Sequence, residues 1–170
     1  MGMVILYTGT GAGKTTNALG LALRTVGHGR KVVIIQFLKG RREIGEYKVK
    51  DKLSPNYEIY QFGTEKFVNV LRPSEGDKRR AKEGLEFARK VLREKKPHLL
   101  ILDEVNLAVA LGLLEVSEVL ELLDEVPEET DVVLTGRYAP AELIDRAEMV
   151  FVITEVKLPK RLYTRPGITY

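Results

Sequence analysis

A glycine-rich segment near the start of the chain has the residue types that bind phosphate groups. It directly follows a short apolar run and consists of Gly9, Thr10, Gly11, Ala12, Gly13, Lys14, Thr15 and Thr16. Glycines let successive backbone N–H groups turn toward an anion, and the N-terminus of a following helix adds partial positive charge. Lys14 is long enough to reach phosphate oxygens, and the Thr15 hydroxyl is a ligand type that Mg²⁺ accepts. The segment therefore predicts a phosphate-binding loop.

This loop differs from two well-defined nucleotide-binding patterns. The strict Walker A sequence, G-x-x-x-x-G-K-[ST], fails because Thr8 stands five residues before Gly13, where a glycine belongs. The dinucleotide-binding pattern fails because Lys14 takes the place of its third glycine, and because the next strand carries Gln36 instead of an acid for a ribose. The loop is interpreted as a Walker A variant, and a glycine-rich turn without a ligand is the alternative.

Two acidic residues follow another apolar run. The run Leu99–Leu102 is directly followed by Asp103 and Glu104. At the carboxyl end of a buried parallel strand, such carboxylates lie near a phosphate-binding loop and hold Mg²⁺ directly or through water. The pattern predicts a metal site of Thr15, Asp103 and Glu104. A helix cap or a solvated turn is the alternative for the two acids.

A third polar segment, Thr135-Gly136-Arg137, follows the next apolar run. Arg137 can bind triphosphate oxygens through two hydrogen bonds, and Gly136 permits a close approach of the backbone. A plain turn with an exposed arginine is the alternative. Four polar segments thus follow predicted strands: 9–16, 36–40, 103–104 and 135–137. Since the carboxyl ends of parallel strands meet at one edge of a sheet, we expect these segments to converge.

Short apolar runs alternate with helical patterns along the chain, which is typical of a parallel α/β sheet. Five runs are continuous, as in strands buried on both faces, and comprise residues 3–7, 32–37, 99–102, 132–134 and 149–153. Residues 57–62 are more polar and are expected at an edge or in a less covered position. The predicted fold is a single P-loop NTPase-like α/β domain over residues 1–170, with a doubly wound, mainly parallel sheet and helices on both faces.

Three helices are predicted between these strands. The first covers residues 15–26, and Gly27-His28-Gly29 ends it. The second carries one apolar stripe behind a capping box of Ser74 and Asp77. Its stripe comprises Ala81, Leu85, Ala88 and Leu92. The third has an apolar stripe that comprises Val116, Val119, Leu120 and Leu123. The connection 41–55 is predicted to be long and polar, either a substrate lid or a plain surface loop.

The composition excludes several classes of protein. The chain has 170 residues, of which 44% are hydrophobic and 30% charged, with no cysteine and no tryptophan. A disordered or collagen-like chain is excluded, as are a disulfide framework, a thiolate metal site and a cysteine nucleophile. No apolar run could span a bilayer, and we expect a cytoplasmic protein with no membrane partner. The net charge of +3 favours solvated faces or a rim around a polyanionic small ligand over nucleic-acid binding.

In their order and spacing, these motifs resemble the P-loop family of ATP:cob(I)alamin (corrinoid) adenosyltransferases. The resemblance extends from Ile5 to Tyr170, and the Thr8 that breaks the strict Walker A pattern is also found in this family. Besides the glycine-rich loop, the matching segments are 20–24, 27–29, Gln36-Phe37-Leu38-Lys39-Gly40, 102–104, 135–137, 139–140 and Gly167-Ile168-Thr169-Tyr170.

The resemblance implies transfer of the 5′-deoxyadenosyl group of ATP to the Co(I) of a corrinoid, with release of triphosphate. It implies ATP binding by residues 9–16, catalytic roles for Lys14, Glu104 and Arg137, and Mg²⁺ as a cofactor. Corrinoid contacts are expected from Phe67, Gln36 and Lys39. Implied partners are an external reductant, such as a flavoprotein, and a second copy of the chain in a homodimer.

The sequence departs from the family at several positions. Many relatives carry lysine where this chain has Ala12, and a histidine is often found at the position of Leu158. Some relatives have a Phe and a Trp that press on the corrin, whereas here Phe67 is followed by Val68. Phe67 is therefore either a corrin contact or a simple hydrophobic anchor.

Two other classes of function remain open from the residues. A RecA-like ATP-hydrolysing switch or motor would use Glu104 to position the attacking water, but no arginine finger stands out. A small-molecule kinase would need a lid with clustered arginines, to which Arg41-Arg42 and Arg79-Arg80 correspond only loosely.

Overall fold

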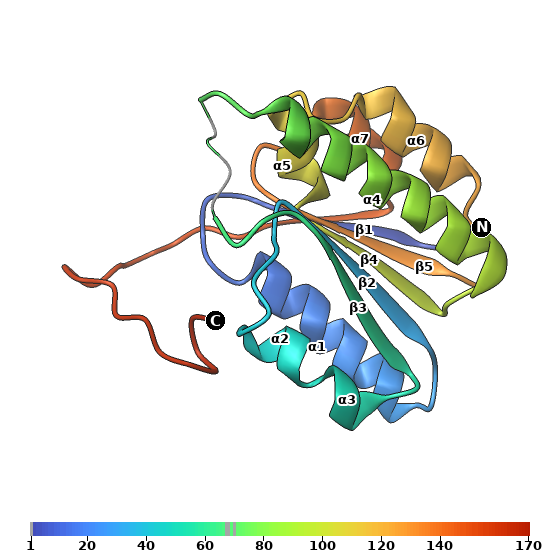
Figure 1. Ribbon diagram of the computed structural model, residues 1–170, viewed down its shortest axis with the longest axis horizontal. Helices are drawn as coiled ribbons and strands as arrows, with labels where there is room; N and C mark the ends of the chain where they lie inside the picture. The colour runs from blue at the N-terminus through green and yellow to red at the C-terminus, as the bar shows by residue number, and fades with distance from the viewer. Residues whose placement is uncertain (1, 67–68, 70) are drawn as a thin grey trace.

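Six short strands form one sheet in the computed structural model of the protein, which describes residues 2–66, 69 and 71–170 (Figure 1). The strands are β1 (Val4–Thr8), β2 (Val32–Phe37), β3 (Tyr57–Phe62), β4 (Leu99–Asp103), β5 (Asp131–Thr135) and β6 (Met149–Val152). All pairs are parallel, and the strand order is β3-β2-β4-β5-β1-β6. The predicted parallel α/β sheet is confirmed, with 57–62 at an edge.

Helices cover both faces of this sheet (Figure 1). The helices are α1 (Lys14–Gly27), α2 (Gly45–Lys48), α3 (Lys50–Leu53), α4 (Glu75–Glu94), α5 (Val105–Ala110), α6 (Val116–Asp124) and α7 (Ala141–Arg146). One face carries α1 to α3, and the other carries α4 to α7. The predicted capping box begins α4, because the Asp77 N–H donates to Ser74 Oγ at 3.1 Å while the Ser74 N–H donates to the Asp77 carboxylate at 2.9 Å.

Each face of the sheet has its own hydrophobic core. On one face, Ala18 and Ala22 of α1 pack against alternate residues of the strands, such as Ile34 and Ile101. On the other face, the predicted stripe of α4 packs against the intervening residues, such as Val33 and Leu100. Burial on both faces explains why these strands are continuously apolar instead of alternating.

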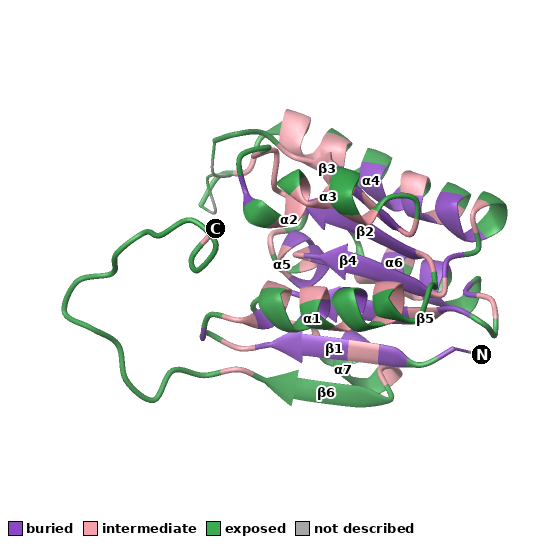
Figure 2. Cartoon of the chain, turned by 90° about the horizontal axis from the view of Figure 1, so that it is seen from below, coloured by how far each residue is buried: buried purple, intermediate pink, exposed green. Residues whose placement is uncertain are grey.

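Strand β6 does not follow this rule. The sequence predicts that it is buried on both faces, but all four of its residues are exposed and it lies at an edge of the sheet beside β1 (Figure 2). Phe151, for example, is 41% exposed although its ring stacks on Tyr7 with 5.3 Å between centroids. The prediction was wrong because an apolar run shows that a strand forms, whereas its burial depends on how far the neighbouring helices extend.

Two long segments outside the sheet differ in their secondary structure. The predicted polar connection 41–55 contains the short helices α2 and α3, so it is partly helical. Residues 153–170, in contrast, form neither helix nor strand and return across the carboxyl edge of the sheet toward α2 (Figure 1).

Of the helices in the described ranges, none combines the length and apolarity needed to cross a membrane.

Candidate functional site

The glycine-rich loop joins β1 to α1 with backbone conformations that glycine adopts most readily. Gly9 has a φ of +105°, and Gly13, directly before α1, has a φ of +113°. The loop also packs closely on the segment after β6. The Gly11 N–H donates to the Ile153 carbonyl at 2.8 Å, and a Cβ on Gly9 would lie 2.3 Å from the same oxygen. These glycines are therefore required by the fold as well as suited to a ligand.

Lys14 is the first residue of α1, and its side chain folds back over the loop. It is only 7% exposed, and its Nζ donates to the Gly11 carbonyl at 2.6 Å. Burial, together with the nearby charge of Arg137, lowers the pKa of Lys14. The ammonium is thus held inside the loop, where it adds positive charge next to the helix N-terminus.

Asp103, at the end of β4, is fully buried and accepts four hydrogen bonds. Its Oδ1 accepts from the hydroxyls of Thr15 at 2.8 Å and Thr135 at 2.7 Å. Its Oδ2 accepts from Gln36 Nε2 at 3.0 Å and Lys39 Nζ at 2.6 Å. Burial raises the pKa of this carboxyl, but the charge of Lys39 and the hydrogen bonds outweigh it and hold the pKa below its usual range. Asp103 is therefore an ionised group at the junction of four segments.

The position of β5 explains the role of Thr135 in this junction. Strand β5 lies between β1 and β4, so Thr135 at its end stands between the glycine-rich loop and Asp103. Its hydroxyl donates to Asp103 and accepts from the Glu104 N–H at 2.9 Å. Sequence reasoning placed Thr135 at this edge, but not as the link between the two acidic residues.

Glu104 turns from the strand end into the same site. Its φ of +65° lies in the left-handed region, as do those of Leu38 after β2 (+62°) and Tyr138 after β5 (+57°). Such conformations cost about 1–3 kcal/mol for residues other than glycine and gather at functional sites. Burial and the neighbouring charge of Asp103 raise the pKa of Glu104. Backbone strain is thus concentrated where the strand ends present their side chains.

Arg137 is exposed and projects from a turn that has little freedom. Gly136 in this turn has a φ of +136°, and a Cβ there would lie 2.8 Å from the Leu107 nitrogen. The buried Asn106 amide donates to the Gly136 carbonyl at 3.3 Å and to the Tyr7 carbonyl at 3.2 Å. Asn106 therefore fixes the turn that carries Arg137, a role that sequence reasoning missed because these contacts join residues far apart in the chain.

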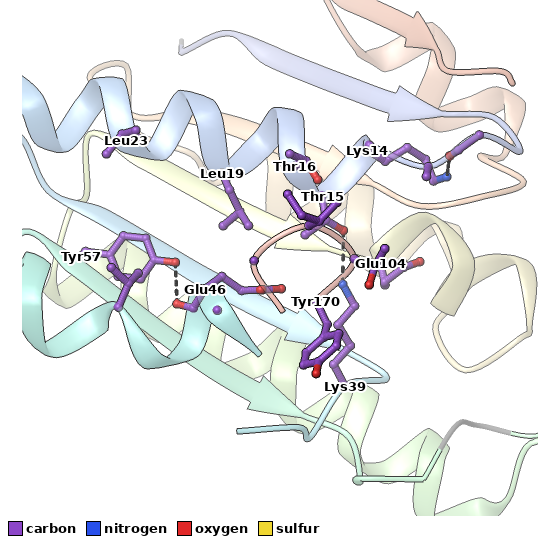
Figure 3. A pocket seen from close by; sticks show the side chains of 18 of the residues that line it. Lys14, Thr15, Thr16, Leu19, Leu23, Lys39, Glu46, Tyr57, Glu104 and Tyr170 are labelled. Atoms are coloured by element: carbon purple, nitrogen blue, oxygen red, sulfur yellow. Dashed lines mark hydrogen bonds between the residues drawn. The ribbon is translucent and has the colours of Figure 1, made fainter. Parts of the chain in front are cut away.

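Several of these groups, among them Lys14, Thr15 and Glu104, line a cavity of about 690 Å³, a size typical of ligand sites (Figure 3). Its polar lining consists of residues 11–16, Lys39, Glu46, Glu104 and Arg137. An apolar wall extends away from the glycine-rich loop and consists of Leu19, Leu23, Val49, Leu53 and Tyr57. Sequence reasoning missed this wall, because Leu19 and Leu23 follow the same helical period as the residues that fill the core.

The segment 167–170 completes the cavity from the opposite side. Its Tyr170 ring lies beside Lys39 in Figure 3, and the Arg41 guanidinium carbon lies 5.9 Å from the centroid of that ring. A turn holds the segment together, since the Gly167 N–H donates to the Tyr170 carbonyl at 2.8 Å. This segment was identified by family resemblance only, and the structure places it at the same cavity as the glycine-rich loop.

The structure brings most of the predicted site residues together. Lys14, Thr15, Glu104 and Arg137 line the cavity, and Asp103 lies directly behind Thr15. The Thr10 hydroxyl, in contrast, donates to the Glu155 carboxylate at 2.9 Å, outside the cavity lining.

The three residues expected to contact a corrinoid differ in their placement. Lys39 lines the cavity. Gln36 is fully buried and bonded to Asp103, so it supports the acidic junction and has no surface for a corrinoid to touch. Phe67 lies outside the residues that the structure describes.

The oxygens of Asp103 and Thr15 are suited to binding a cation. The Lys39 ammonium already lies between them, 2.6 Å from Asp103 Oδ2 and 3.2 Å from Thr15 Oγ1. Within the described residues, no group of three or more His, Asp or Glu side chains could hold a metal ion. A Mg²⁺ ion here would therefore take its remaining ligands from a triphosphate and water, as this ion commonly does.

A family model and the curated relatives point to one family. A model of the family described as ATP:corrinoid adenosyltransferase BtuR/CobO/CobP matches residues 1–170. A corrinoid adenosyltransferase of Escherichia coli K12 is 34% identical over 156 residues, which cover 92% of this chain and 78% of the relative. A corrinoid adenosyltransferase of a Sinorhizobium species is 33% identical over 162 residues, covering 94% of this chain and 75% of the relative.

A solved structure shows the same fold. A KaiC-like protein from the archaeon Pyrococcus horikoshii aligns with a TM-score of 0.57 at 21% identity, covering 89% of this chain and 70% of that protein. The likeness supports the P-loop NTPase-like fold expected from the glycine-rich loop.

Proposed function

Because the chain belongs to the ATP:corrinoid adenosyltransferase family and therefore transfers an adenosyl group from ATP to a corrinoid, we propose that the acceptor atom is Co(I) and that triphosphate is the leaving group. The acceptor would be cob(I)alamin or the Co(I) form of a precursor. The observation that carries this proposal is the convergence of Lys14, Thr15, Glu104 and Arg137 on one cavity beside Asp103. These groups match the charge that develops on a departing triphosphate.

The proposed reaction places few chemical demands on the protein. The Co(I) of the substrate attacks C5′ of ATP, a cobalt–carbon bond forms, and the C5′–O bond breaks with its electron pair going to triphosphate. Co(I) is itself the nucleophile, so the protein needs no serine or cysteine nucleophile, and the chain contains no cysteine. Its task is to hold C5′ in line with cobalt and to stabilise the leaving group.

The described residues divide this task between them. The ammonium of Lys14 lies inside the glycine-rich loop, and the exposed guanidinium of Arg137 approaches from the turn after β5. Both would bind triphosphate oxygens, Arg137 through two parallel hydrogen bonds. Thr15 and Asp103 would hold Mg²⁺, with Glu104 beside them. When bound, this ion would neutralise part of the negative charge that accumulates on triphosphate.

One experiment distinguishes this proposal from ATP hydrolysis and from a kinase. The purified chain is mixed with ATP, Mg²⁺ and a corrinoid that has been chemically reduced to Co(I). We expect the absorption spectrum to change to that of a light-sensitive cobalt–carbon species, and phosphorus NMR to show triphosphate in equal amount. ADP and phosphate without a change in the corrinoid would contradict the proposal. A reaction with the unreduced corrinoid is the control, and it should yield neither product.

Two partners form part of the proposal. A separate reductant, such as a flavoprotein, would supply the electron that makes Co(I), which is supported by the absence of cysteine from the chain.

A second copy of the chain would cover the exposed apolar edge at β6, where Phe151 and Val152 are 41% and 67% exposed. We expect a mass in solution of twice 19.1 kDa, measured by sedimentation equilibrium, and Val152→Lys should produce monomers. A wild-type mass of one chain would argue against the dimer.

A further inference from the structure

Lys39 occupies an unusual position for a lysine in a nucleotide site. It comes shortly after β2 and directly after Leu38, whose φ of +62° lies in the left-handed region. Its Nζ donates to Asp103 Oδ2 at 2.6 Å. It also donates to Thr15 Oγ1 at 3.2 Å, a contact that Figure 3 shows. The ammonium thus bridges the two side chains that the proposed function assigns to Mg²⁺.

The Lys39 ammonium and a divalent metal ion cannot both occupy the site formed by Thr15 and Asp103. Asp103 is fully buried and already accepts from Thr15, Thr135 and Gln36 as well as from Lys39. A divalent ion that reached the Thr15 and Asp103 oxygens would lie within a few ångströms of the Lys39 ammonium. Two positive charges at such a distance repel strongly, because a partly buried site screens them less than water does.

The Lys39 side chain is able to leave this position. It is 27% exposed, whereas the Asp103 side chain is 0% exposed. Lys39 lines the cavity together with the glycine-rich loop, and a lysine stem is flexible. Asp103 is fixed by its other three donors, so a displacement of one cation by another would move Lys39 and leave the carboxylate in place.

We propose that Lys39 is an exchangeable counter-cation that competes with the divalent metal for Thr15 and Asp103, so that the metal binds tightly only together with a triphosphate. This inference rests on the proposed function, since it uses the metal site assigned there. A triphosphate in the loop favours the exchange in two ways. It supplies the metal with further oxygen ligands, and its negative charge attracts the displaced ammonium.

The consequence is an order of binding. Without nucleotide, the ammonium neutralises the buried charge of Asp103 and keeps free metal out of the site. With ATP, metal and triphosphate enter together, and the Lys39 ammonium moves into the cavity that contains the substrate. Lys39 on this basis controls when the metal binds and is not one of its ligands.

The test measures metal binding directly and without turnover. Mn²⁺ replaces Mg²⁺, and its free concentration is followed by electron paramagnetic resonance for the wild type, Lys39→Met and Lys39→Gln. Methionine removes the charge and keeps most of the length of the side chain, whereas glutamine keeps a hydrogen-bond donor for Asp103. Lys90→Met is the matched control, because Lys90 is an exposed residue of α4 far from the cavity, with a side chain 60% exposed. Each protein is titrated without nucleotide, with ATP and with inorganic triphosphate.

We expect the wild type and Lys90→Met to bind Mn²⁺ weakly alone and tightly with ATP or triphosphate. Both Lys39 variants should bind Mn²⁺ without nucleotide at least about tenfold more tightly than the wild type, equivalent to 1.4 kcal/mol. Their thermal unfolding should also shift upward when Mn²⁺ is added without nucleotide. This second readout reports on the same site if loss of the Lys39 charge weakens the fold.

The results distinguish the counter-cation role of Lys39 from the metal site on which that role depends. If the Lys39 variants bind Mn²⁺ no better than the wild type without nucleotide, while ATP still promotes binding in all proteins, the counter-cation role is refuted and the metal site stands. If ATP fails to promote Mn²⁺ binding even in the wild type, the metal site itself is wrong and the inference fails with it.

Discussion

Replacing Lys14 with alanine is expected to lower kcat by about 10²–10³-fold, the range seen when one preorganised group is removed from a developing negative charge. The Lys14 ammonium is held inside the glycine-rich loop by its 2.6 Å hydrogen bond to the Gly11 carbonyl. It is therefore in place before triphosphate begins to leave and needs no rearrangement during the reaction. Turnover is measured as formation of the adenosylated corrinoid under saturating ATP and Co(I) corrinoid.

The fold should tolerate this change. The contact of Lys14 Nζ is local to the loop, and the helix that Lys14 begins remains anchored by the buried Ala18 and Ala22. Circular dichroism and thermal unfolding should therefore resemble those of the wild type. Lys90→Ala is the matched control for loss of a lysine far from the cavity. A Lys14→Ala protein that turns over within about threefold of the wild type would show that the loop does not bind the leaving group.

The strand ends could be predicted because their chemistry is local. A continuous apolar run followed by Gly9 to Thr16, or by Asp103 and Glu104, shows both that a strand forms and what stands at its end. The capping box at Ser74 and Asp77 is equally local, and the structure confirms it. Parallel pairing then brings the ends together, so the main site residues follow from the sequence with little further information.

Features that depend on distant contacts could not be predicted in this way. Strand β6 has the same apolar pattern as the buried strands, and its exposure follows from its place at the edge. The helices α2 and α3 have four residues each, too few for a helical period to appear in the sequence. Gln36 was expected at a corrinoid, yet it is fully buried and binds Asp103, which lies more than sixty residues further along the chain. The contact of Lys39 with the same carboxylate could not be predicted for the same reason.

These distant contacts make Asp103 the residue on which the site depends most. Asp103→Asn is expected to lower kcat/KM by about 10²-fold or more, with most of the loss in the binding and use of the metal. The asparagine can keep all four hydrogen bonds if its amide NH₂ faces Thr15 and Thr135, whose hydroxyls can rotate to accept. Its carbonyl oxygen then faces the Gln36 amide and the Lys39 ammonium, which are donors. The variant should therefore fold, and the charge alone is lost.

Asp103→Ala provides the contrast that separates charge from structure. It leaves the donors that bind the carboxylate without an acceptor in a buried site, and each such unsatisfied group costs about 1–3 kcal/mol. We expect a lower free energy of unfolding in urea for Asp103→Ala than for Asp103→Asn, whereas both lose activity and nucleotide-dependent Mn²⁺ binding. Asp145→Asn, an exposed change on α7, is the control for both measurements. Normal Mn²⁺ binding by Asp103→Asn in the presence of ATP would mean that the metal is held elsewhere. The four hydrogen bonds of Asp103 would then serve only to join the strand ends.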